Sequence, residues 1–164
     1  MNAPLDKPLE QVRPDAAGEP HAGGRAQPAE MRRFSTALSY LWIGIGSALG
    51  GLARYAAGLA IAAGIGGTFP WATVIINVSG SMLIGFFATL TGPDGRIYVP
   101  THGRQFVMAG FCGGYTTFSS FALQTLTLAQ GGHLPRAAAD VAASLMLCFA
   151  GVWVGHAAAA ALNG

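Results

Sequence analysis

The sequence predicts an all-α integral membrane protein, on the basis of its composition and the uneven placement of its charges. Apolar residues make up 52% of the 164 residues, and charged residues only 10%. Five of the 9 Lys and Arg residues and five of the 7 Asp and Glu residues precede position 34, which leaves six charges in the rest of the chain. A water-soluble body so poor in charge would precipitate, so we expect lipid to surround it.

The first 33 residues differ from the rest of the chain. They are rich in Pro, Gly, Ala and mixed charge, without apolar periodicity. Such a segment cannot bury enough apolar surface to fold, so residues 1–33 are predicted to be a disordered tail and residues 34–164 the membrane domain. No apolar core follows the basic residues of the tail, as a secretory signal would require. The slight excess of positive charge comes mainly from tail arginines and does not indicate a nucleic-acid partner.

Four segments of the membrane domain are long and apolar enough to cross a bilayer, which takes about 20 residues of helix. They are residues 39–62, 70–91, 104–130 and 136–161. Stretches rich in Gly and Pro separate them, as expected for connecting loops. Aromatic residues near the proposed ends are typical of the membrane interface. These residues are Tyr40, Trp42, Trp71, Tyr98 and Trp153.

The first span carries small residues along one helical face. Gly46, Gly50, Arg54 and Gly58 follow one another at four-residue steps. Small residues at this spacing let helices approach closely, so the face is predicted to pack against protein rather than lipid. Arg54 must then point into protein. The favoured interpretation is a structural arginine that is bonded to backbone carbonyl groups or reaches the nearby interface, and the alternative is a direct role in attracting an anion.

The second span places polar and small residues on one stripe, again at four-residue steps. This stripe consists of Thr73, Asn77, Ser81 and Gly85. An asparagine at membrane depth is costly unless it is hydrogen-bonded. Asn77 is therefore expected either to join two helices or to donate its amide hydrogens to a passing solute, and the residue alone leaves both possibilities open.

The third span contains the stretch GFCGGYTTFSSF, from Gly110 to Phe121. Adjacent glycines weaken a helix and adjacent threonines favour other geometries, so an interruption from Gly113 to Thr116 is predicted, with a second half-helix beginning near Thr117. Freed carbonyl groups suit a cation, and freed N–H groups at the start of a half-helix suit an anion. Phenyl rings have positive edges, so Phe118 and Phe121, which share a face, can solvate an anion weakly; ordinary packing is the alternative.

The fourth span is rich in alanine and has few polar groups. Asp140 is expected close to the start of its helix, where a carboxylate interacts favourably with the helix dipole. Ser144, one turn later, can bond to its own backbone or line a path. Cys112 and Cys148 have no CxxC pattern and no neighbouring histidine, so both are expected to be small core residues rather than metal or redox groups.

Three of these stretches resemble, in order, the helix motifs of the small fluoride channels known as Fluc or CrcB. GGLARY resembles the first-helix motif, INVSGSMLIGF the second and GFCGGYTTFSSF the third, and the resemblance covers residues 39–161. Two positions depart from the family pattern. Gln124 stands where similar sequences often have a glutamate, and Asp140 stands where an uncharged polar or aromatic residue is expected.

The resemblance implies a passive channel of the cell inner membrane, not an enzyme, that lets fluoride leave the cytoplasm. It further implies an antiparallel, dual-topology homodimer with two pores and a structural sodium ion at the dimer interface. The backbone carbonyls of Gly113 and Thr116 would hold the sodium ion. The implied pore residues are the amide donor Asn77, the ring-edge ligands Phe118 and Phe121, and a polar track of Thr117, Ser120 and Ser144, while Arg54 matches the arginine of the first-helix motif.

Three other functions are alternatives to this one. A proton-coupled small multidrug transporter needs a carboxylate deep in a span, and Asp140 is expected near a helix end. A membrane enzyme or redox protein needs clustered nucleophiles or paired cysteines, which the sequence lacks. A structural subunit would make the broken helix and Asn77 packing features, and the residues alone leave this open.

The distribution of arginines does not favour dual topology, because they gather on the amino-terminal side of the spans.

Overall fold

The computed structural model describes residues 29–65 and 69–164, and their regular structure is helical throughout. Helix α1 runs from Ala29 to Gly64, α2 from Trp71 to Leu90, and α6 from Leu134 to Asn163. The third span consists of α3 (Thr101–Arg104), the π-helix η1 (Gln105–Cys112), α4 (Gly113–Tyr115) and α5 (Phe118–Gln130). Four helical segments are thus long and apolar enough to cross a membrane, as predicted.

Helix α1 begins well before the predicted start of the first span at residue 39. Pro28 is the last proline before it, and neither Gly nor Pro occurs from there to Gly44, so the sequence offers no stop signal. Glu30 in its first turn also interacts favourably with the helix dipole. The predicted disordered tail covers residues 1–33. Residues 1–28 of it lie outside the described residues, and residues 29–33 belong to α1.

The third span is interrupted, but the extended backbone begins at Thr116, three residues after the predicted start at Gly113. Gly113 and Gly114 are helical, and the backbone becomes extended at Thr116 (φ −81°, ψ 158°) and Thr117 (φ −150°, ψ 117°). The predicted interruption over Gly113–Thr116 is therefore wrong in its extent, because the β-branched threonines adopt extended geometry while Gly114 packs closely against Ser47 of α1. The second half-helix begins immediately after Thr117, as predicted.

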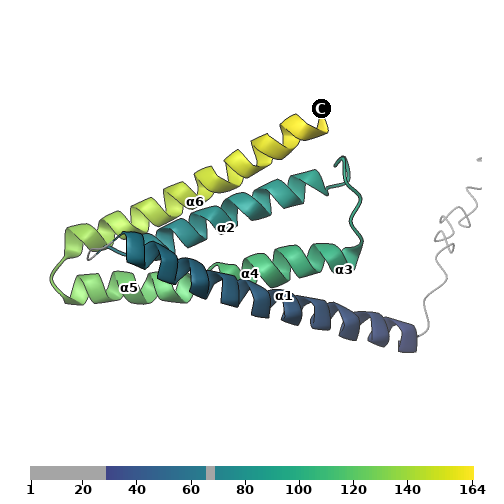
Figure 1. The fold of residues 1–164 in the computed structure, drawn as a ribbon, viewed down its shortest axis with the longest axis horizontal. Coiled ribbons are helices and arrows are strands. Elements are labelled where there is room, and N and C mark those ends of the chain that lie inside the picture. Colours follow the sequence, from purple (N-terminus) through teal and green to yellow (C-terminus); the bar gives the residue numbers. More distant parts are fainter. Residues whose placement is uncertain (1–28, 66–68) are drawn as a thin grey trace, which may run out of the picture.

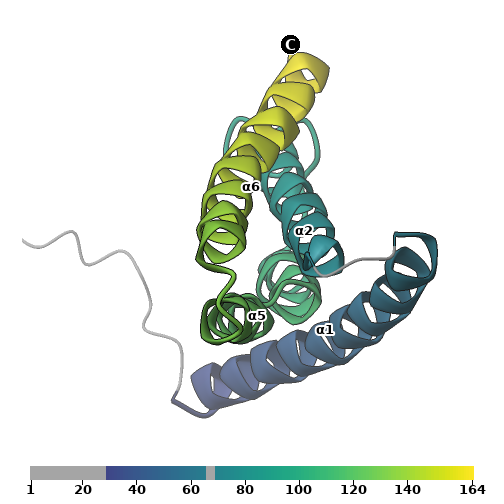
Figure 2. The same cartoon turned by 90° about the vertical axis from the view of Figure 1, so that its left-hand side faces the viewer.

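The third span lies between α1 and a pair formed by α2 and α6 (Figures 1 and 2). Backbones approach closely where α1 meets the third span and where α2 meets α6. A Cβ atom at Gly50 of α1 would overlap the carbonyl oxygen of Phe111, and one at Gly114 would overlap that of Ser47. Between α2 and α6, a Cβ at Gly85 would overlap the carbonyl oxygen of Val152. The predicted packing face of the first span is confirmed.

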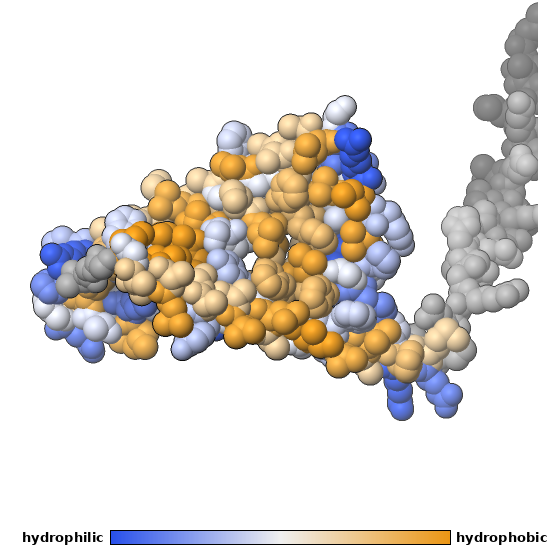
Figure 3. Space-filling view, in the orientation of Figure 1, coloured by the Kyte–Doolittle hydropathy of each residue, from blue (hydrophilic) through white to orange (hydrophobic). Residues whose placement is uncertain are grey.

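The outer surface is that of a multi-pass membrane protein. Large apolar side chains are exposed along all the spans, and Figure 3 shows hydrophobic residues over the middle of the molecule and hydrophilic ones gathered toward its ends. A water-soluble protein does not expose apolar surface on this scale. Lipid, or another protein within the membrane, must cover these side chains.

Close packing at Gly50 gives a direct test of this arrangement. Gly50→Ala should lower the free energy of unfolding by about 1–3 kcal/mol, because the added methyl group meets backbone atoms that cannot move aside. The matched control is Gly44→Ala on the same helix, where an added Cβ has nothing within 4 Å. Thermal unfolding in detergent measures both. Equal melting temperatures for the two variants would contradict the packing of α1 on η1 and α4.

Candidate functional site

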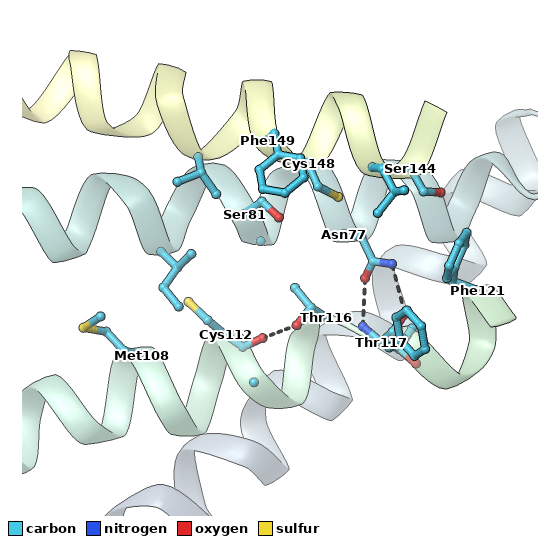
Figure 4. Close-up of a pocket in the computed structure, with 16 residues that line it drawn as sticks. Asn77, Ser81, Met108, Cys112, Thr116, Thr117, Phe121, Ser144, Cys148 and Phe149 are labelled. Carbon is cyan, nitrogen blue, oxygen red and sulfur yellow. Dashed lines mark hydrogen bonds between the residues drawn. The ribbon is translucent and has the colours of Figure 1, made fainter. Parts of the chain in front are cut away.

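A cavity of about 430 Å³ lies where α2, η1, the interruption, α5 and α6 meet (Figure 4). It brings together seven of the nine predicted site residues: Asn77, Gly113, Thr116, Thr117, Phe118, Phe121 and Ser144. No charged side chain lines it within the described part of the chain. The cavity is therefore a mainly apolar space with a few hydroxyl and amide groups, which can contact a small solute without a fixed charge to hold it.

Asn77 of α2 binds the backbone at the interruption through both ends of its amide group. Its Nδ2 donates to the carbonyl oxygen of Thr117 at 3.0 Å, and its Oδ1 accepts from the N–H of Thr117 at 2.8 Å. A side-chain amide carries two N–H hydrogens, so one remains for another acceptor. Asn77 therefore joins the second and third spans, which is one of its two predicted roles. Its remaining N–H is available for the other predicted role, donation to a passing solute.

The start of α5 is capped by Thr117. Its Oγ1 accepts a hydrogen bond from the backbone N–H of Ser120 at 3.2 Å, as expected of a threonine at this position. The hydroxyls of Ser119 and Ser120 also lie 3.2 Å from this oxygen. The N-terminal end of α5 thus opens at the cavity, and its helix dipole favours negative charge there.

Phe118 and Phe121 form an aromatic pair in the first turn of α5. Their ring centroids are 5.5 Å apart and the ring planes are inclined by 58°. Both rings line the cavity, but Phe121 is only 9% exposed whereas Phe118 is 77% exposed. The chain's own side chains therefore bury the ring of Phe121, whereas most of the Phe118 ring is left uncovered.

The interruption frees carbonyl groups from their helical partners. In a continuous helix the N–H of Thr117 would bond to the carbonyl of Gly113, and that of Ser120 to the carbonyl of Thr116. Here the first N–H bonds to Asn77 and the second to Thr117 Oγ1. The break therefore changes the environment of the two carbonyl groups that were predicted to hold a cation.

Arg54 is bonded to a third carbonyl at the break. Its Nε donates to the carbonyl oxygen of Gly114 at 3.2 Å, which confirms the favoured structural interpretation. Arg54 and Ser120 do not line the first cavity. They line a second one of about 350 Å³ between α1, α2 and α5, together with Thr117 and Gln124. Within the described residues, the buried Oε1 of Gln124 has no hydrogen-bond partner.

Asp140 lies further from the start of its helix than predicted. Helix α6 begins at Leu134, with Pro135 in its first turn, and no acidic residue lies in that turn. Asp140 is instead 1% exposed in the second turn and accepts a hydrogen bond from Thr125 of α5 at 2.6 Å. The helix starts earlier than predicted because proline is well tolerated in a first turn.

The two cysteines line the cavity, which the sequence analysis did not predict. Cys112 is buried, as expected, and Cys148 is partly exposed. The spacing could have indicated this, because Cys112 precedes Thr116 by four residues and Cys148 follows Ser144 by four. Each cysteine therefore extends, by one turn, a helical face that was already expected to face the site.

Comparison with known proteins identifies the family. The family model described as "CrcB-like protein, Camphor Resistance (CrcB)" matches residues 41–156. The fluoride-specific ion channel FluC of Rhodospirillum rubrum is 56% identical over 126 residues, which cover 77% of this chain and 98% of that protein. FluC 1 of Bradyrhizobium diazoefficiens is 51% identical over 136 residues, 83% of this chain and 94% of that protein. With its four spans, its interrupted third span and these matches, the chain belongs to the CrcB-like family.

Proposed function

We propose that the chain forms a passive, fluoride-selective channel of the cell inner membrane. The observation that carries the proposal is the uncharged cavity at the interruption, where the amide of Asn77, the start of α5 and two phenyl rings converge. The names of the relatives, fluoride-specific ion channels, support the same function. Fluoride enters cells as a neutral weak acid and ionises inside, so the membrane potential drives the anion outward without another energy source.

The cavity suits this function because fluoride is small and strongly hydrated. Its water must be replaced by hydrogen-bond donors, and the remaining N–H of Asn77, hydroxyl groups and ring edges can replace it. An arginine or lysine in the cavity would bind the anion tightly and slow its release. Donors without net charge let the ion enter and leave.

The chain acts, in this proposal, as a dual-topology homodimer of two inverted copies. Phe118 at 77% exposure and Phe149 at 75% line the cavity from its open side. A second copy would cover these rings and complete the wall of the pore, so that the two copies enclose two pores. A membrane pore needs such a wall, because a path open to lipid would not hold a hydrated ion.

A structural sodium ion at the dimer interface is part of the same proposal. The carbonyls of Gly113 and Thr116 fit this role, because the N–H groups that would occupy them in a continuous helix bond elsewhere. Gly113 is exposed, and an added Cβ there would have nothing within 4 Å. Bound between two copies, the ion would supply the positive charge that these oxygens require in a low-dielectric setting.

A proton-coupled transporter is a weaker candidate. Such a transporter would need a carboxylate deep in a span, and Asp140 is the acidic residue that the fourth span offers. Asp140 is deeply buried, but it does not line the cavity, and its carboxylate is bonded to Thr125. A carboxyl group that carries protons for a transported solute needs contact with the transport path.

The pore residues can be tested by fluoride efflux from proteoliposomes, read with a fluoride electrode while valinomycin carries potassium as the counter-ion. Asn77→Asp should nearly abolish flux, because it replaces a donor by a negative charge. Phe118→Ile and Phe121→Ile should lower flux, since they remove ring edges and keep apolar bulk. The matched control is Phe34→Ile, at an exposed phenylalanine near the start of α1. Wild-type protein without flux would refute the channel, and flux unchanged in all three variants would refute the site.

Sodium binding is expected to stabilise the dimer. Thermal stability in detergent should be higher in sodium than in a large organic cation, since a ligand bound only to the folded dimer raises its apparent stability. Gly113→Leu should remove this difference and shift the protein toward monomer, because a bulky side chain keeps the two interruptions apart. A Gly113→Leu protein that stays dimeric, together with wild-type stability independent of sodium, would show that the ion is not held here.

Dual topology can be measured with reporters fused to the carboxy terminus, one active only in the cytoplasm and one only outside it. Both fusions should be active if the chain inserts in both orientations. The charge distribution makes this a demanding test, because Arg33, Arg96 and Arg104 lie on one side of the spans and Arg136 lies on the other. Activity of a single reporter would refute the antiparallel dimer.

A further inference from the structure

A buried carboxyl group lies directly behind the pore cavity, and the proposed function does not use it. Asp140 accepts a hydrogen bond at Oδ2 from the hydroxyl of Thr125, at 2.6 Å. Its Oδ1 lies 3.5 Å from the hydroxyl oxygen of Ser144, at the long limit of a hydrogen bond. Of these three residues, only Ser144 lines the cavity. Ser144 therefore contacts the carboxylate on one side and the proposed ion path on the other.

The direction of the Ser144 hydroxyl decides what it offers to an anion. Both carboxyl oxygens of Asp140 accept from hydroxyl groups, Oδ2 from Thr125 and Oδ1 from Ser144. A serine hydroxyl has a single hydrogen. When that hydrogen points to Asp140, the oxygen presents lone pairs to the cavity, and these repel an anion. In Figure 4 the oxygen of Ser144 points away from Asn77.

The elements packed against Asp140 offer it hydroxyl groups rather than charges. Neither α2 nor α5 carries a charged or titratable side chain. On α6, Arg136 lies one turn before Asp140 with an exposed side chain, and the titratable residues Cys148 and His156 lie further along the helix. Thr125 and Ser144 are thus the side chains whose hydrogen atoms the carboxylate can orient.

We propose that Asp140 is a positioning residue that holds the hydroxyl of Ser144 away from the pore and so weakens fluoride binding there. The inference rests on the proposed function of the cavity. Asparagine at position 140 would reverse the effect. Its carbonyl can still accept from Thr125, while its NH₂ group donates to the Ser144 oxygen and leaves the serine hydrogen free to turn toward fluoride.

The test is fluoride efflux from proteoliposomes at a series of internal fluoride concentrations, in the wild-type background and in a Ser144→Ala background. In the wild-type background, Asp140→Asn should lower the fluoride concentration at half-maximal flux roughly fivefold, the effect of gaining one net hydrogen bond of about 1 kcal/mol. In the Ser144→Ala background, the same substitution should change nothing. Damage to the fold would not produce tighter binding that depends on a single hydroxyl.

Two further variants complete the experiment, one as a substitute for Asp140→Asn and one as a control. Asp140→Ala replaces Asp140→Asn should the latter not fold, since Thr125 can then bond to its own helix backbone. Thr127→Val is the matched control, because its hydroxyl is exposed and bonds to the carbonyl of Leu123. A shift that persists without Ser144 would mean that charge acts through space, and the absence of any shift would mean that Asp140 does not act on the pore. Either result overturns the inference while wild-type flux keeps the proposed function.

Discussion

In the hydrocarbon interior of a membrane, a chain can leave the helical conformation only where other groups take over its backbone hydrogen bonds. Asn77 does this for Thr117, whose N–H and carbonyl oxygen both bond to its side chain. Arg54 does it for Gly114 from the opposite helix. Without these two side chains the extended residues would leave buried polar groups unpaired, and a continuous helix would be favoured. The open start of α5 and the cavity beside it depend on them.

Glycine faces bring the backbones of neighbouring helices close together. Gly46 and Gly50 let α1 lie against η1 and α4, so that Arg54, one turn further on, reaches the carbonyl of Gly114. Gly85, Gly151 and Gly155 bring α2 and α6 together in the same way. The bond from Arg54 to the carbonyl of Gly114 thus depends on close backbone contact between α1 and the third span. Small residues are favoured in membrane interfaces for this reason, since lipid provides no hydrophobic force between helices.

Much of this arrangement could be predicted from local sequence. The four spans follow from apolar length, the packing face of α1 from its four-residue glycine spacing, and the start of α5 from the two threonines. The burial of Asp140 could not be predicted, because it depends on how α6 packs against α5, where Thr125 bonds to the carboxylate. The π-helix and the exact position of the interruption are also set by packing. Gly114 lies against Ser47 of α1, and no local pattern shows that contact.

The bonds between Asn77 and Thr117 have the form of a hydrogen-bonded residue pair in an antiparallel sheet, where each partner exchanges one N–H and one carbonyl with the other. Here the side-chain amide of Asn77 makes the two hydrogen bonds that the backbone of a neighbouring strand would make. A backbone N–H can only donate and a backbone carbonyl can only accept, so the carboxamide cannot flip, and the direction of its second N–H is fixed by the backbone alone. An arriving ion meets a donor whose orientation is already set, and no side-chain freedom has to be lost when it binds.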